Sequence, residues 1–314
     1  MILAVCPNPS IDTYAWLETF KKGEVNRILR IEEYPGGKGI HVAMALNELE
    51  CPVSLMANWA GSNGEWIKSN ERLNGIDVIG PQLAENTRKC FTFRSDFDHK
   101  FNNTELLEPG PEMTDKDWES FLVQFTMALK DCSLVCLSGS WPKGAPEDAY
   151  YQLLQLCEKD GKDAILDCSG IQLKNALRGN FFGLHINEDE AEANFGTKKQ
   201  SEIKKLLKGK ISLLALTKGK DGLSLYLNDD YIHGNVTIEE VKSTVGSGDC
   251  LTAGIAYAIF NGYSLDQVAK YGVACGAANC LNEDLGILRR EDVNRLLPLV
   301  KLTGNDERKK ILIK

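Results

Sequence analysis

The sequence predicts an α/β protein in which helices flank a largely parallel central sheet and a small β-sheet forms a lid. Beyond Thr114, short apolar runs typical of strands alternate with amphipathic stretches typical of helices, which implies right-handed crossovers between parallel strands. Two hairpin-like segments, at about 12–34 and 86–107, interrupt this alternation. Since no linker rich in proline, serine or glycine divides the chain, we expect residues 1–314 to form a single domain with these two segments as its lid.

In the amino-terminal part, apolar runs and alternating patterns predict strands, and two amphipathic stretches predict helices. The strands are expected at 2–6, 12–20, 25–34, 53–59 and 87–97, and the helices at 40–49 and 65–75. The second helix is expected to end at Gly75. A polar turn at 98–103 should join the strand before it to an antiparallel partner near Thr104.

The carboxyl-terminal part repeats strand and helix and closes with two helices. Strands are expected at 134–140, 163–169, 182–187 and 212–217, and helices at 118–131, 148–161, 188–196, 201–209, 250–263 and 264–281. The charged tail at 305–314 is expected to be mobile.

Charge and composition exclude several classes of protein. The 36 lysines and arginines against 44 aspartates and glutamates give a net charge of −8, so no overall field attracts nucleic acid or acidic lipid. The amino terminus lacks the basic region of a signal peptide, and no apolar run reaches the ~18 residues of a membrane span. We therefore expect a cytoplasmic protein with neither a nucleic acid nor a membrane as partner.

The ten cysteines are interpreted as reduced core residues. Most lie inside apolar segments, no C-x-x-C occurs, and only four histidines are present. A zinc site is therefore not expected.

The sequence TVGSGD contains the strongest candidate site, a glycine-rich turn before an apolar helix. Gly246, Ser247 and Gly248 would let backbone N–H groups converge at the helix start, which is an arrangement that binds anions. Asp249 follows in the first turn of the helix. A carboxylate there would repel a phosphate, so the pattern leaves two roles open for Asp249, a proton acceptor or a helix cap.

A second glycine-rich turn, GGKG at 36–39, also enters a helix. It lacks the G-x-x-x-x-G-K-[ST] spacing of a Walker A loop, and G-x-G-x-x-G is absent from the chain, which disfavours an enzyme that uses a dinucleotide. The turn is compatible with close approach of a polar ligand, and equally with a plain helix start that exposes Lys38. Asp12 follows the first strand and adds a carboxylate near this junction with the lid.

An ordered set of motifs resembles a known family. NPSID, GGKGIHVA, TRKCF, TELLEPGP, LSGSWPKG, LDCSG, N-x-x-E at 187–190 and TVGSGD follow one another along the chain. In this order they resemble the ribokinase-like sugar kinases, and within these the phosphofructokinase B branch, which phosphorylates sugar phosphates. The resemblance covers roughly residues 1–295 and implies a three-layer fold with a β-sheet lid.

The resemblance also implies roles for single residues on the acceptor side. Asp249 would be the catalytic base, beside the turn of Gly246, Ser247 and Gly248, and Asp12 would bind a sugar hydroxyl. The other residues on the side of the acceptor sugar are the turn glycines Gly36, Gly37 and Gly39, the phosphate ligands Lys38 and Arg88, a third phosphate ligand Arg27, and Ser138 of LSGS.

On the nucleotide side, the resemblance implies ATP and Mg²⁺ as cofactors. Asn187 and Glu190 match N-x-x-E, which orients Mg²⁺ and the nucleotide phosphates through water; a polar helix start is the alternative. Thr217 and Gly219 match a strand end near these phosphates. Asn279 matches a position where proteins of the family close over the nucleotide base.

The chain departs from the family pattern at a few positions. His41 stands where an asparagine normally binds the sugar, so it could donate a hydrogen bond in its place, change the preferred sugar, or only pack. His185 and Ile186 replace the usual Lys-Pro before the N-x-x-E motif, and Lys218 replaces an apolar residue.

The resemblance implies transfer of a phosphoryl group from ATP to a hydroxyl of a ketohexose phosphate. Fructose 1-phosphate is the first expectation and tagatose 6-phosphate the alternative; a sensor that keeps the fold without turnover is more distant. We also expect a homodimer formed lid to lid, because a small sheet with one apolar face needs cover. The alternative is a monomer whose lid folds onto its own active-site cleft. The apolar lid residues are Tyr14, Trp16, Leu17, Phe20, Ile28, Leu29, Ile31, Phe91 and Phe93.

Overall fold

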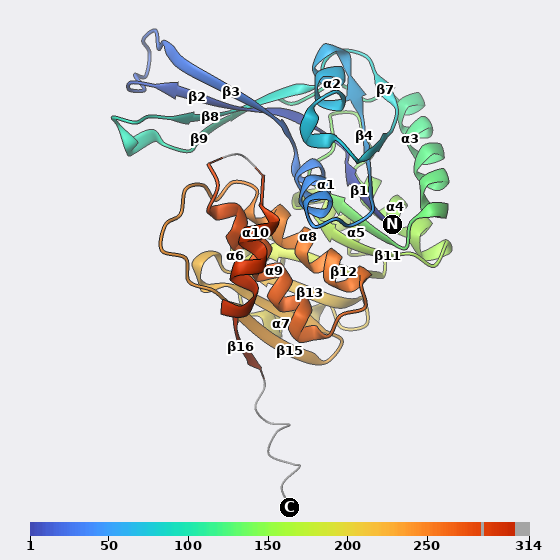
Figure 1. Cartoon of the computed structure of the whole chain (residues 1–314). Helices are drawn as coiled ribbons and strands as arrows, with labels where there is room; N and C mark the ends of the chain where they lie inside the picture. The colour runs from blue at the N-terminus through green and yellow to red at the C-terminus, as the bar shows by residue number, and fades with distance from the viewer. Residues whose placement is uncertain (284–285, 305–314) are drawn as a thin grey trace, which may run out of the picture.

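A ten-stranded sheet forms the centre of the computed structural model, which describes residues 1–283 and 286–304 (Figure 1). The strand order is β16-β15-β14-β13-β12-β11-β10-β1-β4-β6. Parallel pairing runs through β6 (Asp77–Ile79), β4 (Val53–Ala57), β1 (Ile2–Cys6), β10 (Leu134–Ser138), β11 (Asp163–Asp167), β12 (Phe181–Asn187) and β13 (Ile211–Thr217). The antiparallel strands at one edge are β14 (Leu223–Leu227), β15 (Asp230–Asn235) and β16 (Lys301–Gly304).

Strand order reverses beside β1, which pairs with β4 on one side and β10 on the other. From β1 the chain first builds outward through β4 and β6, and later through β10 to β13. In open α/β sheets, ligands bind outside the carboxyl ends of the strands at such a reversal. A ligand site is therefore expected at the carboxyl ends of β1 and β10.

Helices cover both faces of the sheet, because alternate strand residues point to opposite sides. From β1, Ile2, Ala4 and Cys6 join one core cluster, and Leu3 and Val5 join the other. The first face is covered by α1 (Lys38–Glu48), α2 (Gly61–Lys68), α8 (Ser247–Phe260), α9 (Leu265–Cys280) and α10 (Arg290–Leu296). The second is covered by α3 (Asp115–Ala128), α4 (Ala149–Lys159), α5 (Gly170–Ala176), α6 (Glu188–Phe195) and α7 (Gln200–Leu206).

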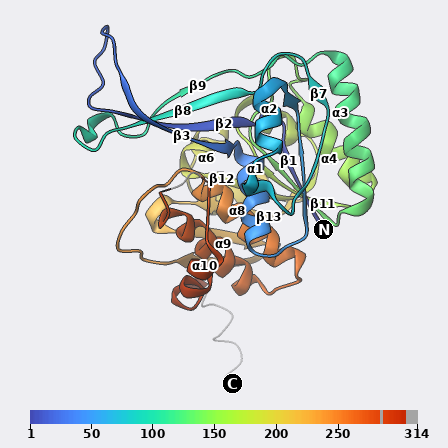
Figure 2. The same ribbon diagram turned by 45° about the horizontal axis from the view of Figure 1, so that its top comes forward.

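A separate four-stranded sheet, in the order β3-β2-β8-β9, extends away from this body (Figures 1 and 2). Its strands are β2 (Ser10–Leu17), β3 (Ile28–Gly36), β8 (Arg88–Arg94) and β9 (Thr104–Leu107). Tyr14 and Trp16 face the body and pack with Tyr34 and Val245. The opposite face contains Ile31 and Leu106, which are 49% and 55% exposed. The apolar residues of the lid thus divide between two faces, and Trp16 is already buried within the chain.

The described elements confirm most of the predicted strands and helices. The helix expected at 65–75 is wrong in its bounds: α2 starts at Gly61 and ends at Lys68, because Asn70 accepts from the backbone N–H of Arg72 and starts a short 3₁₀ helix. The sequence analysis did not predict α5, α10 or the strands β14 to β16. The tail expected to be mobile, 305–314, lies outside the described residues.

All ten cysteines are free, and eight are buried. Burial raises the pKa of the Cys6 thiol to about 11, which fits the prediction of unreactive core cysteines. Within the described ranges, no helix has both the length and the apolarity needed to span a membrane.

Candidate active site at the carboxyl edge of the sheet

Asp249 lies in the first turn of α8, where helix geometry leaves backbone N–H groups without helical partners. The cap position is Gly246, with φ at 81°, and no side chain caps this helix. The Asp249 carboxylate instead contacts α1: its Oδ2 lies 2.8 Å from His41 Nδ1. With a residue exposure of 6%, Asp249 is a buried carboxylate beside the glycine-rich turn, and the helix-cap role is not observed.

The turn GGKG lets β3 pass directly into α1 against Asp12. A Cβ atom on Gly36 would overlap the Asp12 carboxylate, so only glycine permits this approach. Ser10 Oγ donates to Asp12 Oδ1 at 2.6 Å, and His41 Nε2 lies 3.3 Å from Asp12 Oδ2. The structure thus brings Asp12 and Asp249 to opposite sides of His41.

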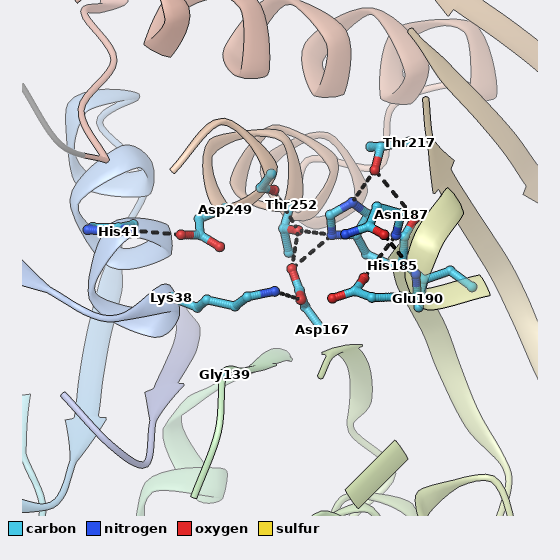
Figure 3. Close-up of polar contacts among 12 residues, drawn as sticks. Lys38, His41, Gly139, Asp167, His185, Asn187, Glu190, Thr217, Asp249 and Thr252 are labelled. Carbon is cyan, nitrogen blue, oxygen red and sulfur yellow. Dashed lines mark hydrogen bonds and ion pairs between the residues drawn. The ribbon is translucent and has the colours of Figure 1, made fainter. Parts of the chain in front are cut away.

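Lys38 forms an ion pair with Asp167, at the end of β11, at 2.6 Å (Figure 3). His185 Nδ1 lies 2.8 Å from the other oxygen of Asp167 and 2.9 Å from Thr252 Oγ1. The Thr252 hydroxyl also donates to the carbonyl of Gly248 at 3.0 Å. This Asp167 network, which consists of Lys38, Asp167, His185 and Thr252, connects α1, two strand ends and the anion-binding turn.

Charge controls the protonation of this network. Burial alone would raise the pKa of Asp167, but Lys38 and then His185 outweigh burial and hold that pKa well below its ordinary value. Burial would likewise lower the pKa of Lys38, but the negative charges of Asp167, Asp249 and Glu190 raise it. The Lys38 ammonium therefore stays charged in the field of these three carboxylates.

On the predicted nucleotide side, Asn187 and Glu190 begin α6 as a capping box. Asn187 Oδ1 accepts from the Glu190 N–H at 2.8 Å, and Glu190 Oε2 accepts from the Asn187 N–H at 2.9 Å. The alternative of a polar helix start is thus observed. The other oxygen of Glu190, Oε1, takes no part in the capping box. Thr217 Oγ1 lies 3.4 Å from His185 Nε2, which links the end of β13 to the Asp167 network.

A cavity of about 590 Å³ opens beside these groups, at the reversal of strand order. It is lined by Lys38, Arg88, Ser138 and Glu190, among others. Four buried atoms of its lining residues have no hydrogen-bond partner among the described residues: Asn8 Oδ1, Arg88 Nε, Ser138 Oγ and Trp141 Nε1. Buried polar groups are normally satisfied, so this cavity has the lining of a site for a polar ligand.

A larger cavity, of about 860 Å³, lies at the opposite ends of β11 to β13. It contains Lys162, Lys204, Lys205, Lys208 and Lys210 but none of the motif residues. Volume alone does not identify the active site, and the smaller cavity is the better candidate because the glycine-rich turns and the unpartnered polar atoms meet near it.

Three predicted site residues lie apart from this centre. Arg27 is exposed in the turn between β2 and β3, Gly219 is exposed beyond β13, and Asn279 is fully buried and donates to the carbonyl of Ile287 at 2.9 Å. The sequence analysis did not select Asp167 and Thr252. A carboxylate that ends the apolar strand DAILD was the available signal for Asp167; Thr252 had none.

Comparisons with known proteins agree with this geometry. The profile of the pfkB family of carbohydrate kinases matches residues 8–289. A 1-phosphofructokinase of Bacillus subtilis is 30% identical over 309 residues, with 96% of this chain and 99% of that protein covered. Phosphofructokinase-2 of Escherichia coli, solved with fructose-6-phosphate, has a TM-score of 0.83 at 21% identity, with 95% of this chain and 98% of that chain covered. A ribokinase of Arabidopsis thaliana, solved with ribose and ATP, has a TM-score of 0.74 at 20% identity, with 94% and 98% covered. The predicted fold is thereby confirmed.

Proposed function

The chain belongs to the pfkB family of carbohydrate kinases and is a sugar kinase, and we propose that it transfers the γ-phosphoryl group of ATP to a hydroxyl of a ketohexose phosphate. Fructose 1-phosphate, which would yield fructose 1,6-bisphosphate, is the preferred acceptor. The observation that carries the proposal is the buried Asp249 carboxylate in the first turn of α8, which interacts electrostatically with Lys38, a residue that lines the polar cavity together with Arg88.

Asp249 would accept the proton of the attacking hydroxyl. One of its oxygens is held by His41, and Figure 3 shows the other pointing away from that histidine. The backbone N–H groups of the Gly246–Gly248 turn would stabilise the charge on the transferring phosphoryl group. Catalysis of phosphoryl transfer is mainly positioning and electrostatic stabilisation, which such a turn supplies without covalent chemistry.

Lys38 is assigned a position between donor and acceptor. The sequence analysis predicts it as a ligand of the phosphate already on the sugar. Because its ammonium faces Asp167, Asp249 and Glu190, we assign it also to the transferring phosphoryl group. When a phosphoryl group binds, the Lys38 ammonium would keep part of its contact with the Asp167 carboxylate, because the Asp167 network needs both of these charges.

Glu190 and Asn187 are assigned to Mg²⁺ and the nucleotide phosphates. The capping box leaves Glu190 Oε1 available, and Glu190 also lines the cavity. Mg²⁺ usually binds through one or two carboxylates, water and substrate phosphates, so a single carboxylate that acts through water fits this ion. Bound Mg²⁺ would neutralise phosphate charge. Thr217 and Gly219 would approach the nucleotide phosphates, and Asn279 would support the segment near the nucleotide base.

The polar lining of the cavity favours an acceptor that is already phosphorylated. Arg88 Nε, Ser138 Oγ and Trp141 Nε1 are donors without partners among the described residues. A phosphate offers several acceptor oxygens to such donors, which suits it better than a neutral sugar. The remaining hydroxyls would meet Asp12 and the glycine turn. The similarity to a 1-phosphofructokinase favours fructose 1-phosphate over tagatose 6-phosphate.

We further assign the chain to a homodimer formed through the lid. The support is the exposed apolar face of the small sheet, which includes Leu29 (62% exposed), Ile31 and Leu106. Arg27 is exposed at the turn of the β2–β3 hairpin, and only in a dimer of this kind could it approach an acceptor phosphate. Ten free thiols suit a reducing compartment such as the cytoplasm.

A coupled assay of ADP release tests the function. Fructose 1-phosphate, fructose 6-phosphate, tagatose 6-phosphate and unphosphorylated fructose are compared at equal concentration with ATP and Mg²⁺. We expect the highest kcat/KM with fructose 1-phosphate and the lowest with fructose. A preference for tagatose 6-phosphate would reassign the acceptor. Binding of a sugar phosphate in calorimetry without ADP release from any acceptor would indicate a sensor and refute the kinase.

A further inference from the structure

His41 lies between two carboxylates that come from different parts of the fold. It occupies the first turns of α1, and its residue exposure is 3%. Nδ1 is 2.8 Å from Asp249 Oδ2 on α8, and Nε2 is 3.3 Å from Asp12 Oδ2 on β2. The second contact is an ion pair rather than an aligned hydrogen bond. Both ring nitrogens are therefore occupied by acidic groups.

This arrangement favours the doubly protonated ring. A neutral imidazole has one N–H donor and one acceptor nitrogen, so a carboxylate opposite each nitrogen is satisfied only by the imidazolium. Burial alone would lower the pKa of His41, but hydrogen bonding and charge from Asp12 and Asp249 outweigh burial and raise the pKa to about 10. Geometry and electrostatics thus agree on a cation at neutral pH.

The groups around the ring leave it no other ionic partner in the described part of the chain. The strands β1, β4 and β10, which pack against α1, contain no aspartate, glutamate, lysine or arginine. The charged side chains of β3, which also contacts α1, have other partners: Arg30 pairs with Glu32, and Glu33 pairs with Lys89. Lys38, on the same helix, pairs with Asp167. The backbone of Gly286 covers the ring so closely that a Cβ atom there would overlap the imidazole. Asp12 and Asp249 are thus the titratable groups that face His41.

We propose that His41 is a positioning residue that joins Asp12 to Asp249 as an imidazolium, fixing one oxygen of the catalytic base while the other remains open to the acceptor hydroxyl. The inference rests on the proposed function of Asp249. A cation between the two carboxylates attracts both of them, so the imidazolium would hold Asp12 and Asp249 in place. A base whose orientation is set by a third group is a recurrent arrangement for activating a hydroxyl.

The same geometry bears on sugar recognition. Nδ1 is held by Asp249, and Nε2 faces Asp12 without an aligned hydrogen bond. Its influence on the sugar would therefore be exerted through the orientation of Asp12 and Asp249, and not by direct contact. Of the three roles that the sequence leaves open for His41, the proposal favours a change in the preferred sugar.

The first test measures the ring itself and needs no turnover. In ¹⁵N-histidine NMR of the wild type, with signals assigned through His41→Asn, we expect both nitrogens of His41 to remain protonated from pH 6 to pH 8.5. Asp12→Asn and Asp249→Asn should each lower the titration midpoint of the ring. A His41 signal of a single neutral tautomer at pH 7.5 would overturn the proposal.

The second test is the pH profile of kcat/KM for the acceptor. In His41→Asn, the acid limb should move upward by about one pH unit, because one of two uncompensated carboxylates then keeps a proton at higher pH. His233→Asn, on β15 away from the site, is the matched control and should keep the wild-type profile. A uniform loss of activity in His41→Asn without a shifted limb would indicate packing alone and refute the inference. Absence of phosphoryl transfer in the wild type would refute the proposed function, while the NMR measurement would still decide the state of His41.

Discussion

Lys38 and Asp167 are 129 positions apart in the chain, and their ion pair of 2.6 Å connects the glycine turn at the start of α1 to the end of β11. Asp167 is almost completely buried, with a residue exposure of 1%. A buried ion pair is costly to break from one side, because the remaining charge is left without compensation. The pair is therefore as important for holding the site together as for its chemistry.

Asp167→Asn should destabilise the protein strongly. Loss of the carboxylate leaves Lys38 without its ion-pair partner, but the Lys38 side chain is 40% exposed and water compensates part of its charge, so the free energy of unfolding should fall by about 1.5–3 kcal/mol. Urea unfolding measures the change. Asp148→Asn, which breaks the exposed pair with Arg178, is the control and should cost about 0–1 kcal/mol. Equal losses in the two variants would contradict a structural role for the Asp167 network.

Asp249→Asn should keep the fold and lose turnover. The amide retains the size of the side chain but cannot accept the proton, so kcat should fall by roughly 10²–10⁴. Steady-state ADP release and circular dichroism measure activity and fold. Asp266→Asn, in the first turn of α9 and exposed, is a matched control with expected normal activity. Near-normal turnover in folded Asp249→Asn would remove this residue from the mechanism.

Arg88→Ala and Lys38→Ala should differ in their kinetic effects. Arg88→Ala should raise KM for the sugar phosphate. The fall in kcat/KM should correspond to a loss of about 2–4 kcal/mol of transition-state stabilisation, with little change in KM for ATP. Lys38→Ala should also lower kcat, because its ammonium faces the proposed base. Lys89→Ala, which pairs with Glu33 on the lid, is the control. If Arg88→Ala raised KM for ATP and left KM for the sugar phosphate unchanged, the assignments of the two subsites would have to be exchanged.

The charge on His41 should appear in the dependence of stability on pH. Its pKa in the folded protein, about 10, lies above the ordinary 6.5, so its contribution is complete below pH 6.5 and is lost as the pH rises toward 10. The free energy of unfolding of the wild type should fall across this window by at most about 5 kcal/mol. The decrease should be smaller in His41→Asn. Parallel curves for the two proteins would be inconsistent with the raised pKa.

The lid should mediate dimerisation through its outer face. Light scattering of the wild type at micromolar concentration should give the mass of two chains, and Leu29→Glu with Ile31→Glu should give one. Val123→Glu, on α3 and 60% exposed, is the control that should remain dimeric. Trp16 is unsuitable for this test because it is buried against the body. A wild type with the mass of one chain and full activity would exclude the dimer.

Much of the fold was predictable because its signals are local. The apolar strand Ile2–Cys6 and the glycine turns display their structure within a few residues. The antiparallel strands β14 to β16 were not predicted, since they are short and β16 pairs with a segment distant in the sequence. The site shows the same limit. Asp249 follows a recognisable turn, whereas the contacts of Asp167 with His185 and Thr252 arise only when three elements meet.

The central place of β1 has a consequence for biosynthesis. The strand lies between β4 and β10, so about 130 residues must follow it before both of its edges can pair. At about 5–20 residues per second, that delay is roughly 7–26 seconds. During this time an apolar strand with one unpaired edge would be accessible to other nascent chains. The yield of native protein should therefore depend on chaperones that shield the emerging amino terminus, and slowing translation should increase that dependence.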